Sequence, residues 1–255
     1  MKYHNHILDV GAYNGVDGLA LAINNPNFLV HAFEANPDLI DLIKENKKKI
    51  EKYKKKEICN YIINNCAVSN TVGTLDFNIA KNPTVSSLNK FSENLDNSWE
   101  GYKEEHLKYI KKIKVKVITL EQYCLENKIN NINYLHIDTQ GNDLKVLKGL
   151  KKKINILEQG VLEAAVSKEK SLYEGNHTVE DVKRYLIKEN FKILKIENID
   201  KNIKNEKNIF FLKENLKSNK NLILKYNLRY YNRIISGRVN FKDRFLDNLR
   251  IFFKF

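Results

Sequence analysis

The chain has 255 residues, of which 42% are hydrophobic and 29% charged, which is typical of a soluble protein with one α/β domain and an appendage, or two small domains. No apolar run approaches the roughly 18 to 20 residues that span a bilayer, and no secretory signal pattern is present, so a cytoplasmic protein is expected. The three cysteines are scattered without metal-ligand spacing and predict reduced thiols.

The formal net charge of +13 at pH 7 points toward a nucleic-acid partner, but the charge is unevenly placed. Residues 213–255 hold eleven Lys and Arg against three Asp and Glu, a net charge of +8, which leaves +5 for the first 212 residues. The basicity therefore belongs mainly to the C-terminal segment, and the mildly basic body weakens the nucleic-acid interpretation.

Short apolar runs alternate with helical patterns along the first 212 residues. Strands are predicted at 6–10, 28–34, within 57–69, at 73–80, at the start of 114–127, at 132–138 and 158–166, and in a closing hairpin of 191–198 and 206–213. Helices are predicted from residue 17, over 38–53, in the second part of 114–127, over 143–150 and over 178–190. This alternation indicates an α/β fold with a mostly parallel sheet, helices on both faces, and an antiparallel last strand.

Helix caps and one long polar stretch add detail to this prediction. Thr119 is near a helix cap position, and Thr178 with Asp181 matches a capping box. The polar stretch 81–112 has little periodicity beyond a candidate helix around 99–110, and its length favours a functional loop or lid.

The stretch "LDVGAYNGVDG" predicts a strand, a glycine turn and a helix. Gly11 is expected to let the chain turn, Gly15 to let a ligand approach the backbone, and the helix N-terminus to present free amides. Glu34 ends the next strand about 20 residues on, where an acid holds the hydroxyls of a ribose. The spacing is neither the G-x-G-x-x-G of dinucleotide enzymes nor a P-loop. The pattern favours an adenosine-type site over a purely structural turn.

The sequence also resembles the FkbM-type S-adenosylmethionine-dependent methyltransferases over roughly residues 6 to 212. The landmarks, in chain order, are "ILDVGAYNG", "AFEANP", "NCAVSN" with "GTLDF", "SSL", "VITLEQY", "LHIDTQGNDLKVLKG" and "LEAAVSKEKSLYEG". The "DTQG" block is the most specific of them, although Asn142 and Asp143 depart from the residues usual there. The resemblance implies a Rossmann-like, doubly wound class I methyltransferase domain over 1–213, followed by a helical extension over 214–255 that the family core lacks.

The resemblance further implies S-adenosyl-L-methionine as the cofactor and three groups of contacts with it. Glu34 would hold the ribose, and Asp17 would pair with the ammonium of the methionine part or simply favour the start of the helix. The methionine part would lie against Asp9, Gly11, Tyr13, Asn14 and Gly15. The adenine would lie beside Asn65, Cys66 and Ala67.

The stretch "YLHIDTQGND" ends a buried strand with acids, an amide and a glycine. Asp138 is the candidate that orients an acceptor hydroxyl and receives its proton, because a methyl carried on a sulfonium needs mainly alignment. Gln140 and Asp143 would hold the loop or the acceptor, and Gly141 would make the turn. Glu163, in the next strand, is the candidate second acid. The alternative for Asp138 and Asp143 is that each merely caps a helix.

Other polar residues favour structural roles. His136 is interpreted as a packed strand residue, His177 as a surface loop residue, and Ser86 and Ser87 either as family landmarks or as loop caps. No G-x-S-x-G elbow and no metal-ligand spacing is present in the sequence, so no serine nucleophile and no required metal are expected.

Residues 214–255 predict one or two basic amphipathic helices with an apolar stripe. The stripe comprises Leu224, Leu228, Tyr231, Ile235, Phe245, Leu249 and Phe252. Packing on the body or on a second copy of the chain is favoured. Peripheral contact with an anionic membrane and nucleic-acid binding are the two alternatives.

The function expected from the residues and the resemblance together is O-methylation of a hydroxyl, on a sugar of a surface glycan or on a secondary metabolite. The alternatives are a nucleic-acid methyltransferase, which the basic charge favours, and a non-catalytic protein that binds a nucleoside cofactor or assists assembly.

Overall fold

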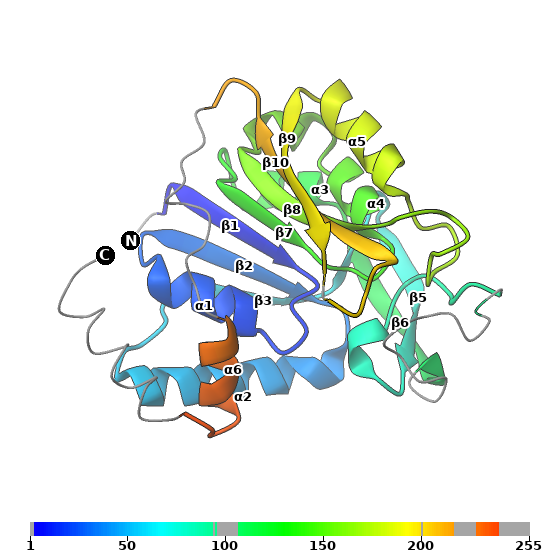
Figure 1. Ribbon diagram of the computed structural model, residues 1–255. Helices are drawn as coiled ribbons and strands as arrows, with labels where there is room; N and C mark the ends of the chain where they lie inside the picture. The colour runs from blue at the N-terminus through cyan, green and yellow to red at the C-terminus, as the bar shows by residue number, and fades with distance from the viewer. Residues whose placement is uncertain (1–2, 94, 96–106, 200, 217–227, 240–255) are drawn as a thin grey trace.

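A seven-stranded sheet forms the centre of the protein, as a computed structural model describes it for residues 3–93, 95, 107–199, 201–216 and 228–239. The strand order is β3-β2-β1-β7-β8-β10-β9 (Figure 1). In chain order the strands are β1 (Asn5–Val10), β2 (Phe28–Glu34), β3 (Tyr61–Asn65), β7 (Tyr134–Ile137), β8 (Gln159–Ala165), β9 (Phe191–Asn198) and β10 (Glu206–Lys213). All neighbours from β3 to β8 pair in parallel, whereas β10 is antiparallel to both β8 and β9. The predicted doubly wound sheet with an antiparallel last strand is confirmed.

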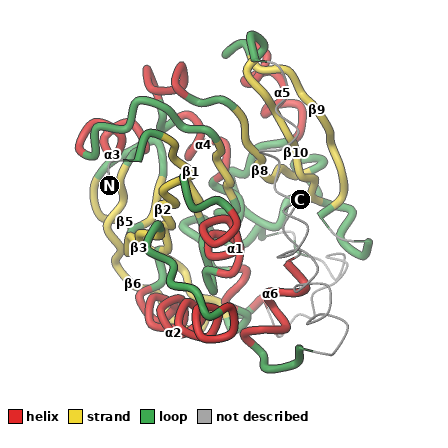
Figure 2. The backbone as a smooth tube through the Cα atoms, turned by 90° about the vertical axis from the view of Figure 1, so that its left-hand side faces the viewer, coloured by secondary structure: helices red, strands yellow, loops and turns green. Residues whose placement is uncertain are grey.

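Helices cover both faces of this sheet (Figures 1 and 2). One face carries α1 (Val16–Asn24) and α2 (Pro37–Lys54), and the other carries α3 (Leu120–Glu126), α4 (Asp143–Lys148), the short helix η3 (Lys151–Ile156) and α5 (Val179–Lys188). Successive residues of β1 point to opposite faces, so Ile7 joins the core under α1 while Leu8 joins the core under α3. This two-sided burial explains why the strands read as continuous apolar runs.

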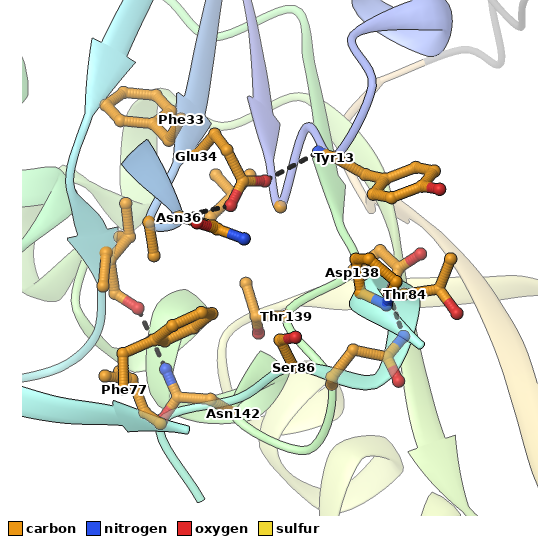
Figure 3. A pocket seen from close by; sticks show the side chains of 18 of the residues that line it. Tyr13, Phe33, Glu34, Asn36, Phe77, Thr84, Ser86, Asp138, Thr139 and Asn142 are labelled. Carbon is orange, nitrogen blue, oxygen red and sulfur yellow. Dashed lines mark hydrogen bonds between the residues drawn. The ribbon is translucent and has the colours of Figure 1, made fainter. Parts of the chain in front are cut away.

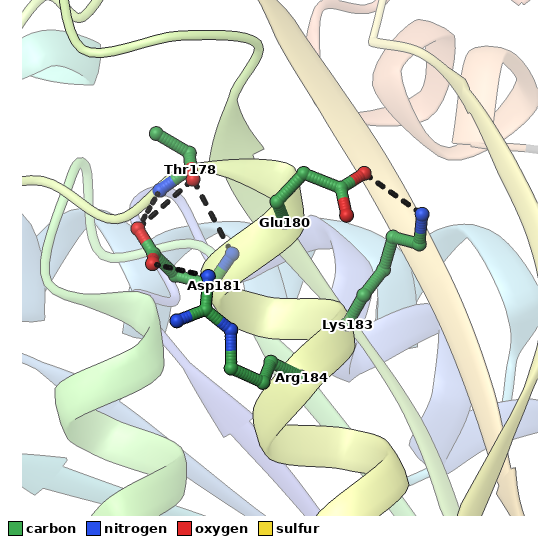
Figure 4. A network of polar contacts seen from close by, with 5 residues as sticks. All are labelled: Thr178, Glu180, Asp181, Lys183 and Arg184. Carbon is green, nitrogen blue, oxygen red and sulfur yellow. Dashed lines mark hydrogen bonds and ion pairs between the residues drawn. The ribbon is translucent and has the colours of Figure 1, made fainter.

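Side-chain caps set where several helices begin. The Thr119 side chain accepts a hydrogen bond from the backbone N–H of Gln122 at the start of α3. Thr178 and Asp181 form the reciprocal capping box of α5, beside an ion pair between Glu180 and Lys183 (Figure 4). Both predicted caps are confirmed.

A second, three-stranded sheet lies beside the main one, in the order β4-β6-β5. Its strands are β4 (Ala67–Val68), β5 (Gly73–Ala80) and β6 (Tyr109–Ile118), and the short helix η1 (Pro83–Val85) follows β5. The strand predicted at residue 114 begins at Tyr109, so the proposed helix is wrong at residues 109–110. The reason is the alternation of "KIKVKV", whose valines are buried while the intervening lysines are exposed. Residues 99–106 of the predicted helix lie outside the described residues.

Within the predicted extension the structure describes one helix, α6 (Leu228–Ile235), which packs against α1 and α2 (Figure 2). Tyr230, Tyr231 and Ile234 are buried there, and the Asn24 amide donates to the Tyr231 hydroxyl at 2.9 Å. The expected apolar positions Leu224, Phe245, Leu249 and Phe252 lie outside the described residues. No described helix is long and apolar enough to cross a membrane.

Candidate active site

The carboxyl ends of β1, β2 and β7 are joined by backbone hydrogen bonds. The N–H groups of Gly11 and Ala12 both donate to the carbonyl oxygen of Phe33, at 3.0 and 2.9 Å, and the N–H of Asp138 donates to the carbonyl oxygen of Val10 at 2.9 Å. Gly11 has φ +90°, and a Cβ there would lie 1.8 Å from the carbonyl oxygen of Asp138. Only glycine therefore lets β1 turn against the end of β7.

Gly15 has a different role from the expected one. Its φ is +76°, but a Cβ there would lie 2.7 Å from Cγ2 of Ile43 and 3.2 Å from the Tyr61 hydroxyl. The space beside its Cα is thus filled by α2 and β3. The structure corrects the interpretation that Gly15 opens the backbone to a ligand: it lets α1 begin against its protein neighbours.

A cavity of about 280 Å³ opens at the joined strand ends (Figure 3). Eight of the predicted site residues line it: Gly11, Tyr13, Glu34, Cys66, Ala67, Asp138, Gln140 and Glu163. They come from five separate segments of the chain, so the fold brings both predicted groups, the cofactor-binding and the catalytic residues, to one space.

The other five predicted residues, Asp9, Asn14, Gly15, Asp17 and Asn65, are not among the lining residues. The Asn14 side chain accepts from the N–H of Val16 at 3.1 Å, and the Asn65 amide donates to the carbonyl oxygen of Glu34 at 2.9 Å. Asn14 therefore supports the start of α1, Asn65 supports the end of β2, and Asp17 lies in the first turn of α1.

Asp9 is fully buried, and its Oδ1 lies 2.8 Å from Nδ1 of His136. Despite burial, this partner and the charges of Asp17 and Asp138 raise the pKa of His136 to about 9. His136 is therefore the cationic partner of Asp9, a more specific role than the packed strand residue expected from the sequence.

Glu34 is held firmly at the end of β2. Its Oε2 accepts from the N–H of Tyr13 and its Oε1 from the N–H of Asn36, both at 2.7 Å (Figure 3). Only 6% of the residue is exposed, and this burial raises the pKa of its carboxyl to about 7 in spite of the two bonds. Each oxygen retains a lone pair for a ligand, so Glu34 can accept from a pair of hydroxyls.

Gln140 orients Asp138. Its Nε2 donates to Oδ1 of Asp138 at 2.6 Å, and its own Oε1 lies 2.9 Å from the hydroxyl of Tyr173. Gln140 has φ +56°, and its carbonyl oxygen accepts from the Ser87 hydroxyl at 2.6 Å. Burial raises the pKa of Asp138, so this carboxyl is disposed to accept a proton.

Asp143 is buried behind the cavity wall and holds the loop together. Its Oδ2 accepts from the Thr139 hydroxyl at 3.0 Å, and its Oδ1 accepts from the N–H of Glu163 at 3.3 Å. Burial raises the pKa of Asp143 to about 7. Between the two roles predicted for it, the structure favours support of the loop over contact with the acceptor.

Glu206, at the start of β10, was missed by sequence reasoning although it lines the cavity. The only local signal was an acid at the first position of an apolar strand.

Ser86 also lines the cavity, whereas Ser87 ties its loop to Gln140. Among the described residues, no group of three or more His, Cys, Asp or Glu side chains is arranged to hold a metal ion.

Asn142, one of the two departures from the family pattern, is buried and ties α4 to the second sheet. Its Nδ2 donates to the carbonyl oxygen of Val68 at 2.9 Å, and its Oδ1 lies 3.3 Å from the Ser69 hydroxyl. The substitution thus fixes the position of one wall of the cavity (Figure 3).

Solved structures with similar folds are methyltransferases of low sequence identity. TrmK of M. capricolum in complex with S-adenosyl-homocysteine has 13% identity and a TM-score of 0.42, covering 86% of this chain and 68% of that one. Fibrillarin of Aeropyrum pernix with bound S-adenosyl-L-methionine has 8% identity and a TM-score of 0.43, covering 83% and 67%.

A methyltransferase FkbM from Methylobacillus flagellatus KT has 12% identity and a TM-score of 0.48, and the match covers 82% of this chain but only 43% of that protein. No curated protein matches the sequence. Residues 9–193 match the methyltransferase FkbM domain, which is well over half of the chain. The chain therefore belongs to the FkbM methyltransferase family.

Proposed function

We propose that this protein is an S-adenosylmethionine-dependent O-methyltransferase that acts on a hydroxyl, on a sugar of a surface glycan or on a secondary metabolite. One observation carries the proposal: Glu34 and Asp138, from the ends of β2 and β7, line the same cavity. A ribose-binding acid and a proton-accepting acid thus share one space within an FkbM fold.

The residues present suit the cofactor. Glu34 offers a rigid, buried carboxyl for the ribose hydroxyls, and Gly11 lets the end of β1 pack against the backbone of Asp138 at the edge of the cavity. An apolar wall fit for an adenine ring comprises Leu39, Cys66, Ala67, Val68, Phe77 and Leu88. The other charged lining residues are acids, which suits a positively charged sulfur.

The chemistry asked of the protein is alignment and removal of one proton. S-adenosylmethionine, when bound, supplies a methyl group on a positively charged sulfur. Asp138 accepts the hydrogen bond of the acceptor hydroxyl and takes its proton as the hydroxyl oxygen is methylated. Gln140 fixes the carboxyl for this step through its bond to Oδ1, and such preorganisation contributes several kcal/mol to catalysis.

Calorimetry with S-adenosylmethionine and S-adenosylhomocysteine tests the cofactor assignment. Glu34→Ala is expected to weaken both affinities at least about tenfold, or about 1.4 kcal/mol. Glu45→Ala, an exposed acid on α2 paired with Lys49, is the matched control and should bind as the parent does. Absence of binding to the parent protein would overturn the proposal.

A screen with labelled methyl donor then tests the acceptor, using cell-envelope glycans, small alcohols and RNA. Label on a glycan or alcohol oxygen is the expected result. Preferential labelling of RNA would instead support the nucleic-acid alternative, which the net charge of +13 favours.

A further inference from the structure

Glu163 and Glu206 lie on one face of the sheet, on neighbouring antiparallel strands. Glu163 of β8 pairs with Asn208 of β10, and Ala165 pairs with Glu206. The two acids are therefore diagonal neighbours, with Cβ atoms about 7 Å apart, within reach of long side chains. Both line the cavity.

Neither carboxyl has a partner in the described part of the chain. Only 6% of Glu206 is exposed, yet no hydrogen bond or ion pair to its side chain is present among the described residues, and the same holds for the side chain of Glu163. By contrast, Glu34, Asp138 and Asp143 all accept hydrogen bonds. Because both side chains line the cavity, a ligand bound there can supply the donors that the described residues do not.

The charge of the cavity wall is one-sided. The charged residues that line it are Glu34, Asp138, Glu163 and Glu206, and none of the described lining residues is Lys, Arg or His. Burial, together with the neighbouring carboxyls, raises the pKa of Glu163 and of Glu206, because a negative charge in this wall is poorly solvated and has no cation beside it among the described lining residues. The same surroundings would disfavour an anionic group of a ligand, whereas a hydroxyl or an ammonium would find acceptors and would favour ionisation of the carboxyls.

We propose that Glu163 and Glu206 form an acceptor subsite that recognises neighbouring hydrogen-bond donors, the hydroxyl or amino groups of a neutral or amino sugar, and rejects acidic acceptors. This inference rests on the proposed function and specifies its substrate class. Glu206 is thereby a specificity-determining residue supplied by the inserted strand β10. Glu163, the candidate second acid, binds the acceptor.

The probe for this subsite is an analogue of S-adenosylhomocysteine in which a carbon bearing an amino group replaces the sulfur. Its ammonium points where the transferred methyl would point, toward the acceptor side. The parent protein is expected to prefer this analogue to S-adenosylhomocysteine about tenfold or more. The preference is expected to grow as the pH rises through the pKa of Glu206, which burial raises to about 8.

The variants are judged by this preference ratio, which normalises each to its own binding of S-adenosylhomocysteine. Glu206→Gln and, independently, Glu163→Gln are expected to reduce the ratio at least about fivefold. Glu214→Gln, an exposed acid just beyond β10, should leave it unchanged. Two isosteric variants keep the test valid if one of them fails to fold.

The outcomes separate the two proposals. Binding of S-adenosylhomocysteine with no preference for the amine, or with a ratio that both variants leave intact, overturns the acceptor subsite alone. No binding of either compound overturns the proposed function and this inference with it. In a labelling assay with neutral, amino and uronic-acid glycosides, transfer mainly to the uronic acid also overturns the inference.

Discussion

The carboxyl groups on the two sides of the cavity differ in the hydrogen bonds that they accept from the protein. On the β2 side Glu34 accepts two backbone N–H groups at 2.7 Å, whereas on the β8–β10 side Glu163 and Glu206 accept none from the described residues. The first side is preorganised by local turns of the chain. The second leaves its acceptors open, as expected where a ligand with several donors completes the hydrogen bonding.

Gly11→Ala should have the largest effect, because it would disrupt the contact between the end of β1 and the end of β7. The new Cβ would lie 1.8 Å from the carbonyl oxygen of Asp138, at a φ of +90° that disfavours alanine. Denaturant unfolding should show a loss of stability on the order of 4 kcal/mol or more.

Gly175→Ala is the matched control for this variant. Its φ is +66°, but no atom lies within 4 Å of the added Cβ, so only the backbone strain of about 1–2 kcal/mol is expected. Equal losses for the two variants would contradict the close approach of β1 and β7.

Asp138→Asn separates catalysis from binding. Because asparagine cannot take the acceptor proton, kcat should fall about 10²- to 10⁴-fold while the Kd for S-adenosylhomocysteine changes little. Single-turnover transfer of labelled methyl and calorimetry measure the two quantities. A weakened Kd with an unaltered kcat would assign Asp138 to the cofactor side.

Glu206→Gln should change how the stability of the protein depends on pH. Burial raises the pKa of Glu206 to about 8, so the folded chain keeps this proton while the unfolded chain releases it near the ordinary value of 4.5. The unfolded state therefore binds fewer protons in this window, and the stability of the parent falls as pH rises from about 4.5 to about 8.

The glutamine cannot ionise, so the stability of the variant should not fall with pH for this reason. At pH 8.5 the free energy of unfolding of the variant should exceed that of the parent by at least about 1 kcal/mol. Thermal unfolding between pH 4 and 9, without cofactor, measures the difference. Parallel curves for parent and variant would show that Glu206 is not held in a desolvated position.

Thr178→Ala should have the smallest effect. It removes the capping box of α5, whose N-cap residue forms a backbone bridge to Ala165 at the end of β8. A loss of about 1 kcal/mol is expected, with unchanged binding of S-adenosylhomocysteine. Thr178→Ser, which keeps the capping oxygen, is the control, and a loss of cofactor affinity in the alanine variant would mean that the two sides are coupled.

Local patterns predicted most of the main sheet and one side of the site. The alternation of strands and helices, the caps at Thr119 and Thr178, the turn at Gly11 and the acid at Glu34 each depend on a few neighbouring residues. Such patterns act through backbone conformation and periodic burial, which a single sequence displays.

The errors arose where distant segments meet. The second sheet requires β4, β5 and β6 to pair around a polar stretch, and the role of Gly15 depends on Ile43 of α2 and Tyr61 of β3. Neither partner is visible in the residues around the glycine.

The order of the elements, the glycine turn and the acids at two strand ends could be predicted from the residues alone, because each follows from periodicity or turn chemistry within one segment. The position of Glu206 beside Glu163 could not, since it depends on the insertion of β10 between β8 and β9 in the folded sheet. Pairing between strands far apart in the chain is fixed by the packing of the whole domain, which no short stretch encodes.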